Sequence, residues 1–152
     1  MKIVLSKILV SFTMILSFVG CVTTTPTTNC TTKHAYKNHI KARITYYHKY
    51  EDKYGSKVAM PSVKKAKEGT TVAARRKFLF GTNFFIPELK KFIFGDGNVK
   101  VQDRGIAVEK LKASHGKTEV IDVYIDAPNK RTAYQRISHI TASASPYMDV
   151  YY

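Results

Sequence analysis

Cysteine is nearly absent from this chain of 152 residues, which has only Cys21 and Cys30. Both precede the part of the sequence that can fold, so a cysteine nucleophile and cysteine-ligated metal sites are excluded. The five histidines include no pair at the i, i+3 or i, i+4 spacing of a helical metal site. A glycine-rich phosphate loop and a G-x-S-x-G nucleophile elbow are also missing. We therefore expect neither a metal nor a cofactor.

Long hydrophobic runs are also lacking. The apolar run Ile8–Val19 has 12 residues, whereas a membrane-spanning helix needs about 20. Lys2 and Lys7 precede this run. A basic start followed by an apolar run is typical of a secretory signal peptide, here over residues 1–20. The run ends at Cys21, as in a bacterial lipoprotein cleavage site, so Cys21 is predicted to carry lipid. Ordinary signal cleavage near Cys21 is the alternative, and in either case the protein is exported, to the membrane or to the periplasm and cell envelope.

The segment after the signal has no residues that could build a core. "VTTTPTTNCTT", residues 22–32, is rich in threonine, and we expect residues 21–39 to form a flexible tether. If Cys21 carries lipid, Cys30 has no partner. If it does not, the two cysteines can pair, because an exported compartment permits disulfides. The sequence leaves both states open.

Acidic residues are scarce, with 11 against 25 lysines and arginines. Residues 40–152, the expected single domain, hold all 11 acidic residues and 21 of the basic ones, which gives a formal charge of +10. A basic domain often binds nucleic acid. The export signal instead favours cell-wall polymers and anionic lipid head groups, so no nucleic acid partner is expected. A general bias toward lysine, without any partner, explains the charge equally well.

The domain shows short strand patterns separated by turn residues, and one helical pattern. The strand patterns lie at residues 42–48, 70–74, 81–87, 91–94, 98–102, 119–125 and 146–152. Residues 91–94 and 98–102 read as a hairpin around the turn at 95–97. Residues 128–140 can form a helix capped by Asn129, and residues 106–117 a loop with a short helical turn. The pattern predicts a mainly β fold, a small β-barrel with one C-terminal helix and a closing strand.

The strand pattern "TEVIDVYIDAP", residues 118–128, carries two aspartates. Alternation puts aliphatic side chains on one face and Asp122, Tyr124 and Asp126 on the other. A half-exposed strand with a solvated polar face explains this without any function. The functional alternative is that the polar face forms the floor of a binding groove. Asp103, at the end of another strand, is either part of an Asp–Arg turn or a second acid of that groove.

Four short motifs, in order, resemble landmarks of a known family. They are Ala73-Ala74-Arg75, Phe80-Gly81-Thr82, Asp103-Arg104-Gly105 and Val120-Ile121-Asp122-Val123-Tyr124. Over about residues 41–126 the chain is similar to the three-aspartate (3D) domain of the membrane-bound lytic transglycosylase A group and to rare lipoprotein A barrels. The resemblance implies a six-stranded double-psi β-barrel that acts, as a monomer, on peptidoglycan glycan strands.

The resemblance also implies residue roles. Asp122 falls at the position of the catalytic acid and Asp103 at that of a supporting acid. The motif positions Thr45, Tyr47, Arg104 and Tyr124 are the expected substrate-binding residues. The implied reaction is cleavage of the MurNAc–GlcNAc β-1,4 bond to a 1,6-anhydroMurNAc product, with one aspartate as acid and base. Arg75 replaces the family's first acid, so a non-catalytic, expansin-like barrel that binds wall polysaccharide is the alternative.

Overall fold

The computed structural model describes residues 36–93 and 95–152. The predicted signal peptide, the lipidation of Cys21 and residues 21–35 of the predicted tether, with Cys30, lie outside this part of the chain. Residues 36–39, the end of the predicted tether, belong to the fold instead, since Tyr36 donates a hydrogen bond to Asn98 and His39 begins the first strand. Within it, no helix combines the length and the apolar composition needed to cross a membrane.

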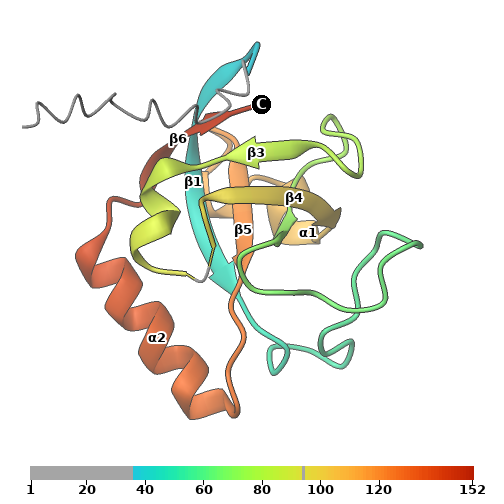
Figure 1. The fold of residues 1–152 in the computed structure, drawn as a ribbon, viewed down its shortest axis with the longest axis vertical. Coiled ribbons are helices and arrows are strands. Elements are labelled where there is room, and N and C mark those ends of the chain that lie inside the picture. The colour runs from blue at the N-terminus through green and yellow to red at the C-terminus, as the bar shows by residue number, and fades with distance from the viewer. Residues whose placement is uncertain (1–35, 94) are drawn as a thin grey trace, which may run out of the picture. The chain divides into compact units, whose positions relative to one another are not determined.

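The described chain is mainly β, with one long helix near its C-terminus, as the sequence predicted (Figure 1). The strands are β1 (His39–Tyr47), β2 (Thr71–Ala73), β3 (Asn83–Phe85), β4 (Asn98–Asp103), β5 (Val120–Tyr124) and β6 (Tyr147–Tyr151). The helices are α1 (Ile106–Glu109), α2 (Lys130–Ser143) and the 3₁₀ turns η1 (Pro87–Lys91) and η2 (Lys112–Ser114).

Hydrogen bonding links the six strands in the order β1-β5-β2-β4-β3-β6, and β6 pairs with β1, so that the neighbours form a closed ring. The pairs β1–β5 and β2–β4 are parallel, and the remaining pairs are antiparallel. Alternate side chains of the strands build one core, because neighbours in register share a face. Val72 stands opposite Val123 and Ile44 opposite Ile121, and all four are buried in that core.

The hairpin prediction was partly wrong. Strand β4 has its antiparallel partner in β3, with Phe84 opposite Val99, and not in residues 91–94. Pro87 opens the 3₁₀ turn η1 instead, because its fixed φ suits a first helical position and it has no N–H to give a sheet. The predicted turn glycine is confirmed: Gly97 has φ +84°, and a Cβ there would lie 2.8 Å from the carbonyl oxygen of Ile86. The described strands therefore number six and not about seven.

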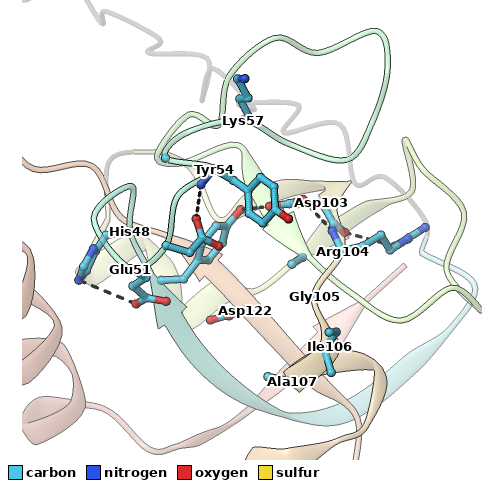
Figure 2. Close-up of a pocket in the computed structure, with 14 residues that line it drawn as sticks. His48, Glu51, Tyr54, Lys57, Asp103, Arg104, Gly105, Ile106, Ala107 and Asp122 are labelled. Carbon is cyan, nitrogen blue, oxygen red and sulfur yellow. Dashed lines mark hydrogen bonds and ion pairs between the residues drawn. The ribbon is translucent and has the colours of Figure 1, made fainter.

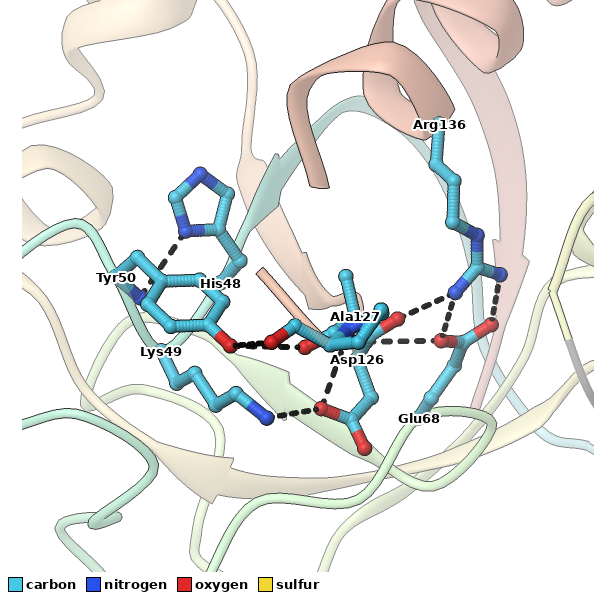
Figure 3. Close-up of polar contacts among 8 residues, drawn as sticks. His48, Lys49, Tyr50, Glu68, Asp126, Ala127 and Arg136 are labelled. Atoms are coloured by element: carbon cyan, nitrogen blue, oxygen red, sulfur yellow. Dashed lines mark hydrogen bonds and ion pairs between the residues drawn. The ribbon is translucent and has the colours of Figure 1, made fainter. Parts of the chain in front are cut away.

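Helix α2 begins as predicted and is held to the strands by a partly buried ion pair. The side chain of Asn129 accepts a hydrogen bond from the Thr132 N–H at 2.9 Å, which caps the helix. On the same helix, Arg136 donates two hydrogen bonds to Glu68, just before β2, and one to the carbonyl of Asp126, just after β5 (Figure 3). The guanidinium thus joins three segments that are far apart in the sequence.

Candidate functional site

The strand register brings the two predicted acids to one face. Asp122 of β5 and Asp103 of β4 both stand opposite Ala73 of β2, the strand between them. Directly opposed residues point to the same side of a sheet, so both carboxyl groups flank the small Ala73 side chain. Thr45 of β1 stands opposite Asp122 on its other side.

This face forms the floor of a pocket of about 220 Å³ (Figure 2). The loop after β1, which contributes lining residues from His48 to Lys57, forms one wall. The start of α1, with Gly105, Ile106 and Ala107, forms another. Asp122 lies on β5 at the floor, below the loop and beside the start of α1.

The surroundings of Asp122 disfavour the charged form of its carboxyl group. Its Oδ1 atom is buried and has no hydrogen-bond partner among the described residues. Burial, together with the negative charges of Glu51 and Asp103, raises its pKa from 3.8 to about 7, and a hydrogen bond from Thr45 opposes this rise. The group therefore titrates near neutral pH, where it can both give and take a proton.

Asp103, in contrast, is fully engaged by the protein. It accepts hydrogen bonds from the Tyr47 hydroxyl at 3.0 Å, the Ala59 N–H at 2.9 Å and the Arg104 N–H at 2.8 Å. These donors come from β1, the following loop and the end of β4, so the carboxylate fixes the loop wall over the floor. Asp103 thus lies in the Asp–Arg turn and also lines the pocket, and its role as a second acid stays a prediction.

Arg104 is placed at the pocket but does not point its charge into it. Its guanidinium donates to the carbonyl oxygens of Ala74 and Phe78, each at 2.7 Å, and lies over the Phe80 ring at 4.2 Å. These contacts hold the segment after β2 against the end of β4. Arg104 therefore has a structural role, and its contact with substrate stays a prediction, since the residue also lines the pocket.

Of the two tyrosines predicted to bind substrate, Tyr47 lines the pocket and Tyr124 does not. Tyr124 is 1% exposed and packs edge-on against Tyr47, with ring centroids 5.3 Å apart. Tyr47 lines the pocket and holds Asp103, and its pKa is raised by burial and by that aspartate. The outer face of β5 is thus covered rather than solvated, because the loop after β1 folds over it. Thr45 acts on Asp122 through its hydrogen bond.

Sequence reasoning missed the residues that the loop contributes. Glu51, which is 42% exposed, and the ring of Tyr54, which is 62% exposed, both line the pocket. The ammonium group of Lys53 lies over the Tyr54 ring at 5.4 Å. Loop positions have no periodicity, so the only signal was the cluster of charged and aromatic residues in "KYEDKYG".

Arg75, which by sequence falls at the position of the first acid in the family that the chain resembles, does not line the pocket. It forms an ion pair with Glu119 at 3.1 Å, and Lys77 contacts the same carboxylate at 2.8 Å. Asp126 is exposed outside the pocket and pairs with Lys49 at 3.1 Å. Within residues 36–93 and 95–152, no group of three or more His, Cys, Asp or Glu side chains could hold a metal ion.

No family model, no curated protein and no solved structure matches the chain. The chemistry of the pocket is therefore the main basis for assigning a function.

Proposed function

We propose that the described domain binds peptidoglycan glycan strands in this pocket and cleaves the MurNAc–GlcNAc β-1,4 bond as a lytic transglycosylase. The observation that carries the proposal is Asp122, whose buried, unpartnered Oδ1 lines the pocket and whose pKa is raised to about 7. A glycosidic oxygen leaves only when it is protonated, and an acid with this pKa is a suitable donor near neutral pH.

The proposed reaction has one bond made and one broken. Asp122 donates its proton to the leaving glycosidic oxygen as the bond to C1 breaks. The C6 hydroxyl of the same MurNAc attacks C1 and closes a 1,6-anhydro ring. The proton of that hydroxyl passes to a carboxylate of the pocket, in the simplest case to Asp122 itself. No water is consumed, unlike in glycosidases that hydrolyse the bond.

The sugar-binding surface in this proposal is the mouth of the pocket. Tyr54 and Ile106 are 62% and 70% exposed, and both line the pocket. An exposed aromatic ring can stack on the apolar face of a sugar. Tyr54 thus replaces Tyr47 and Tyr124 as the stacking residue.

The finer fold assignment, a double-psi β-barrel, is part of the same proposal. The closed ring of six strands and its two parallel pairs support it. So does the place of the motifs, because the segments carrying Ala73, Asp103 and Asp122 come from separate parts of the chain and meet at one floor. We propose that the domain works as a monomer.

The cell-envelope location is also a proposal, since it depends on Cys21. A lipid on Cys21 would anchor the domain to the membrane through the tether. Cys21→Ser should release the protein from the membrane fraction into the soluble one. The lipid anchor would be contradicted if the wild-type protein carries no lipid and the variant fractionates as the wild type does.

One observation favours a different function, that of a non-catalytic wall-binding domain. Arg75 stands at the position of the family's first acid, and its guanidinium forms an ion pair with Glu119. In this alternative, the pocket binds the glycan strand without cleaving it, as expansin-like barrels do.

Digestion of purified sacculi separates the two functions. Wild type should release 1,6-anhydromuropeptides, detected by mass spectrometry, and Asp122→Asn should lower the rate by about a hundred- to ten-thousand-fold. Asp126→Asn, a matched change of an exposed acid just beyond β5, should leave the rate unchanged. Binding without anhydro product from wild type would establish the binding domain instead. Full cleavage by Asp122→Asn would contradict the assigned acid.

A further inference from the structure

Four carboxylates line the pocket, and they differ in the hydrogen bonds that they accept from the protein. Asp103 accepts three hydrogen bonds from the protein. Asp52 accepts one from the Tyr54 N–H at 2.8 Å, within its own turn. Asp122 is the proposed acid. Glu51 is the remaining one: it accepts a hydrogen bond from the backbone of His48, and its Oε1 atom lies 3.8 Å from the Nε2 nitrogen of that histidine, beyond hydrogen-bond distance.

That histidine, His48, has a defined tautomer. Its Nδ1 accepts a hydrogen bond from the Tyr50 N–H at 3.1 Å, so in the neutral ring the proton is on Nε2 (Figure 3). Nε2 is buried and has no hydrogen-bond partner among the described residues, and it is the atom that lies 3.8 Å from Glu51 Oε1 (Figure 2). The ring is 2% exposed and packs edge-on against Tyr134 of α2. A rigid donor is thus aimed at the carboxylate of Glu51.

We propose that Glu51 is the second catalytic carboxyl group of this site and accepts the proton of the attacking C6 hydroxyl, while Asp122 donates to the leaving oxygen. This inference rests on the proposed glycan cleavage and replaces its simplest form, in which Asp122 makes both transfers. The O6–C1 bond forms and the bond from C1 to the leaving oxygen breaks. The O6 proton moves to Glu51, and the Asp122 proton moves to the leaving oxygen. Exchange with solvent then restores both groups.

The surroundings of Glu51 suit a base. Burial raises its pKa above 4.5, as does the adjacent Asp52, whereas His48 lowers it. A carboxylate with a raised pKa is a better proton acceptor near neutral pH. Its 42% exposure lets it exchange protons with solvent. The other charged groups that line this pocket are Asp103, Asp122, Lys57 and Arg104.

The test uses Glu51→Ala and Glu51→Gln in the full-length protein, with release of anhydromuropeptides from sacculi as the readout. Both changes should lower the rate by at least about a hundred-fold, and the acid limb of the pH–rate profile should disappear. Sodium formate should restore activity to Glu51→Ala in a concentration-dependent way, because it can supply the missing carboxylate. Sodium chloride at equal ionic strength should not. Asp126→Asn, outside the pocket, is the matched control.

A pair of histidine variants tests the positioning role of His48. Asn keeps an acceptor near Nδ1 for the Tyr50 N–H but removes the Nε2 donor, whereas Gln keeps a donor near Nε2. His48→Asn should therefore fold normally and move the acid limb of the pH–rate profile to higher pH, since the electrostatic effect of the imidazole, which lowers the pKa of Glu51, is lost. His48→Gln should keep that limb closer to its wild-type position.

The outcomes separate this inference from the proposed function. If wild type cleaves sacculi and Glu51→Gln cleaves at the same rate with the same pH profile, the role of Glu51 is wrong and the function stands. The role of Glu51 is equally wrong if the activity of Glu51→Ala does not respond to formate. If wild type releases no anhydro product, both proposals are overturned.

Discussion

At the scale of the single residue, the burial of Asp122 lowers the stability of the fold at pH values above the pKa of this carboxyl group. Its folded pKa of about 7 lies above the ordinary value of 3.8, so between these pH values the folded protein binds more protons than the unfolded chain. The contribution to the free energy of unfolding is therefore complete below about pH 4 and is lost as pH rises through about 7. Three pKa units correspond to roughly 4 kcal/mol.

Asp122→Asn should remove this pH dependence, because an amide does not titrate. We expect the variant to be a few kcal/mol more stable than wild type at pH 8 and of similar stability at pH 4. Urea unfolding of both proteins at a series of pH values measures the difference directly, since all other titrating groups are shared. A difference that stays constant from pH 4 to pH 8 would show that Asp122 is not a neutral, buried acid.

At the same scale, the sequence could identify Asp122 and Asp103 but not their surroundings. Strand alternation and a motif position mark Asp122, and both are local properties of the chain. The burial of Tyr124 and the position of Glu51 depend on how a loop of irregular structure folds over β5. The contacts of Arg104 could not be predicted for a similar reason, since its carbonyl partners become neighbours only when the strands assemble.

At the scale of the element, the strands with clear alternation were predictable and the hairpin partner of β4 was not. Residues 91–94 are apolar and aromatic like a strand, yet Pro87 directs the preceding residues into the turn η1. The helix α2 was predictable because its cap, Asn129, is a local signal. The common register of Asp103 and Asp122 opposite Ala73 was not, because it is set by the pairing of three strands distant in sequence.

The attachment of α2 to the strands gives a prediction at this scale. Arg136→Met should leave the Glu68 carboxylate, which is 6% exposed, without its guanidinium and cost about 3–5 kcal/mol of unfolding free energy. Adding Glu68→Gln should recover part of this loss, because the amide removes the charge and still accepts the Asp126 N–H. Chemical denaturation of the single and double variants measures both effects.

The exposed pair Lys49–Asp126 provides the matched control for that cycle. Because exposed ion pairs contribute little, Lys49→Met should change stability much less than Arg136→Met does. A loss for Arg136→Met no larger than that for Lys49→Met would contradict the structural role assigned to the Arg136–Glu68 pair.

At the scale of the whole molecule, charge and stacking should contribute separately to wall binding. The domain carries a formal charge of +10, and exposed charges are screened beyond about 8 Å at physiological ionic strength. Pelleting with purified cell walls should therefore weaken as salt increases. Tyr54→Ala should remove the part of the binding that salt does not affect, since stacking on a sugar ring is not screened.

The result of the salt series distinguishes these contributions. Wall binding that does not depend on salt would show that the positive charge has no role in it. A Tyr54→Ala variant with the same residual binding at high salt as wild type would show that this ring does not contact the sugar.

The central claim is that Asp122 is a carboxylic acid kept protonated close to neutral pH by its place in the pocket. The most direct measurement is a titration of its side-chain carboxyl group by ¹³C nuclear magnetic resonance in the full-length protein, assigned by comparison with Asp122→Asn. The account predicts a pKa near 7, and a lower value in Glu51→Gln because a neighbouring negative charge is removed. A carboxyl group that titrates near 4 in both proteins would contradict it.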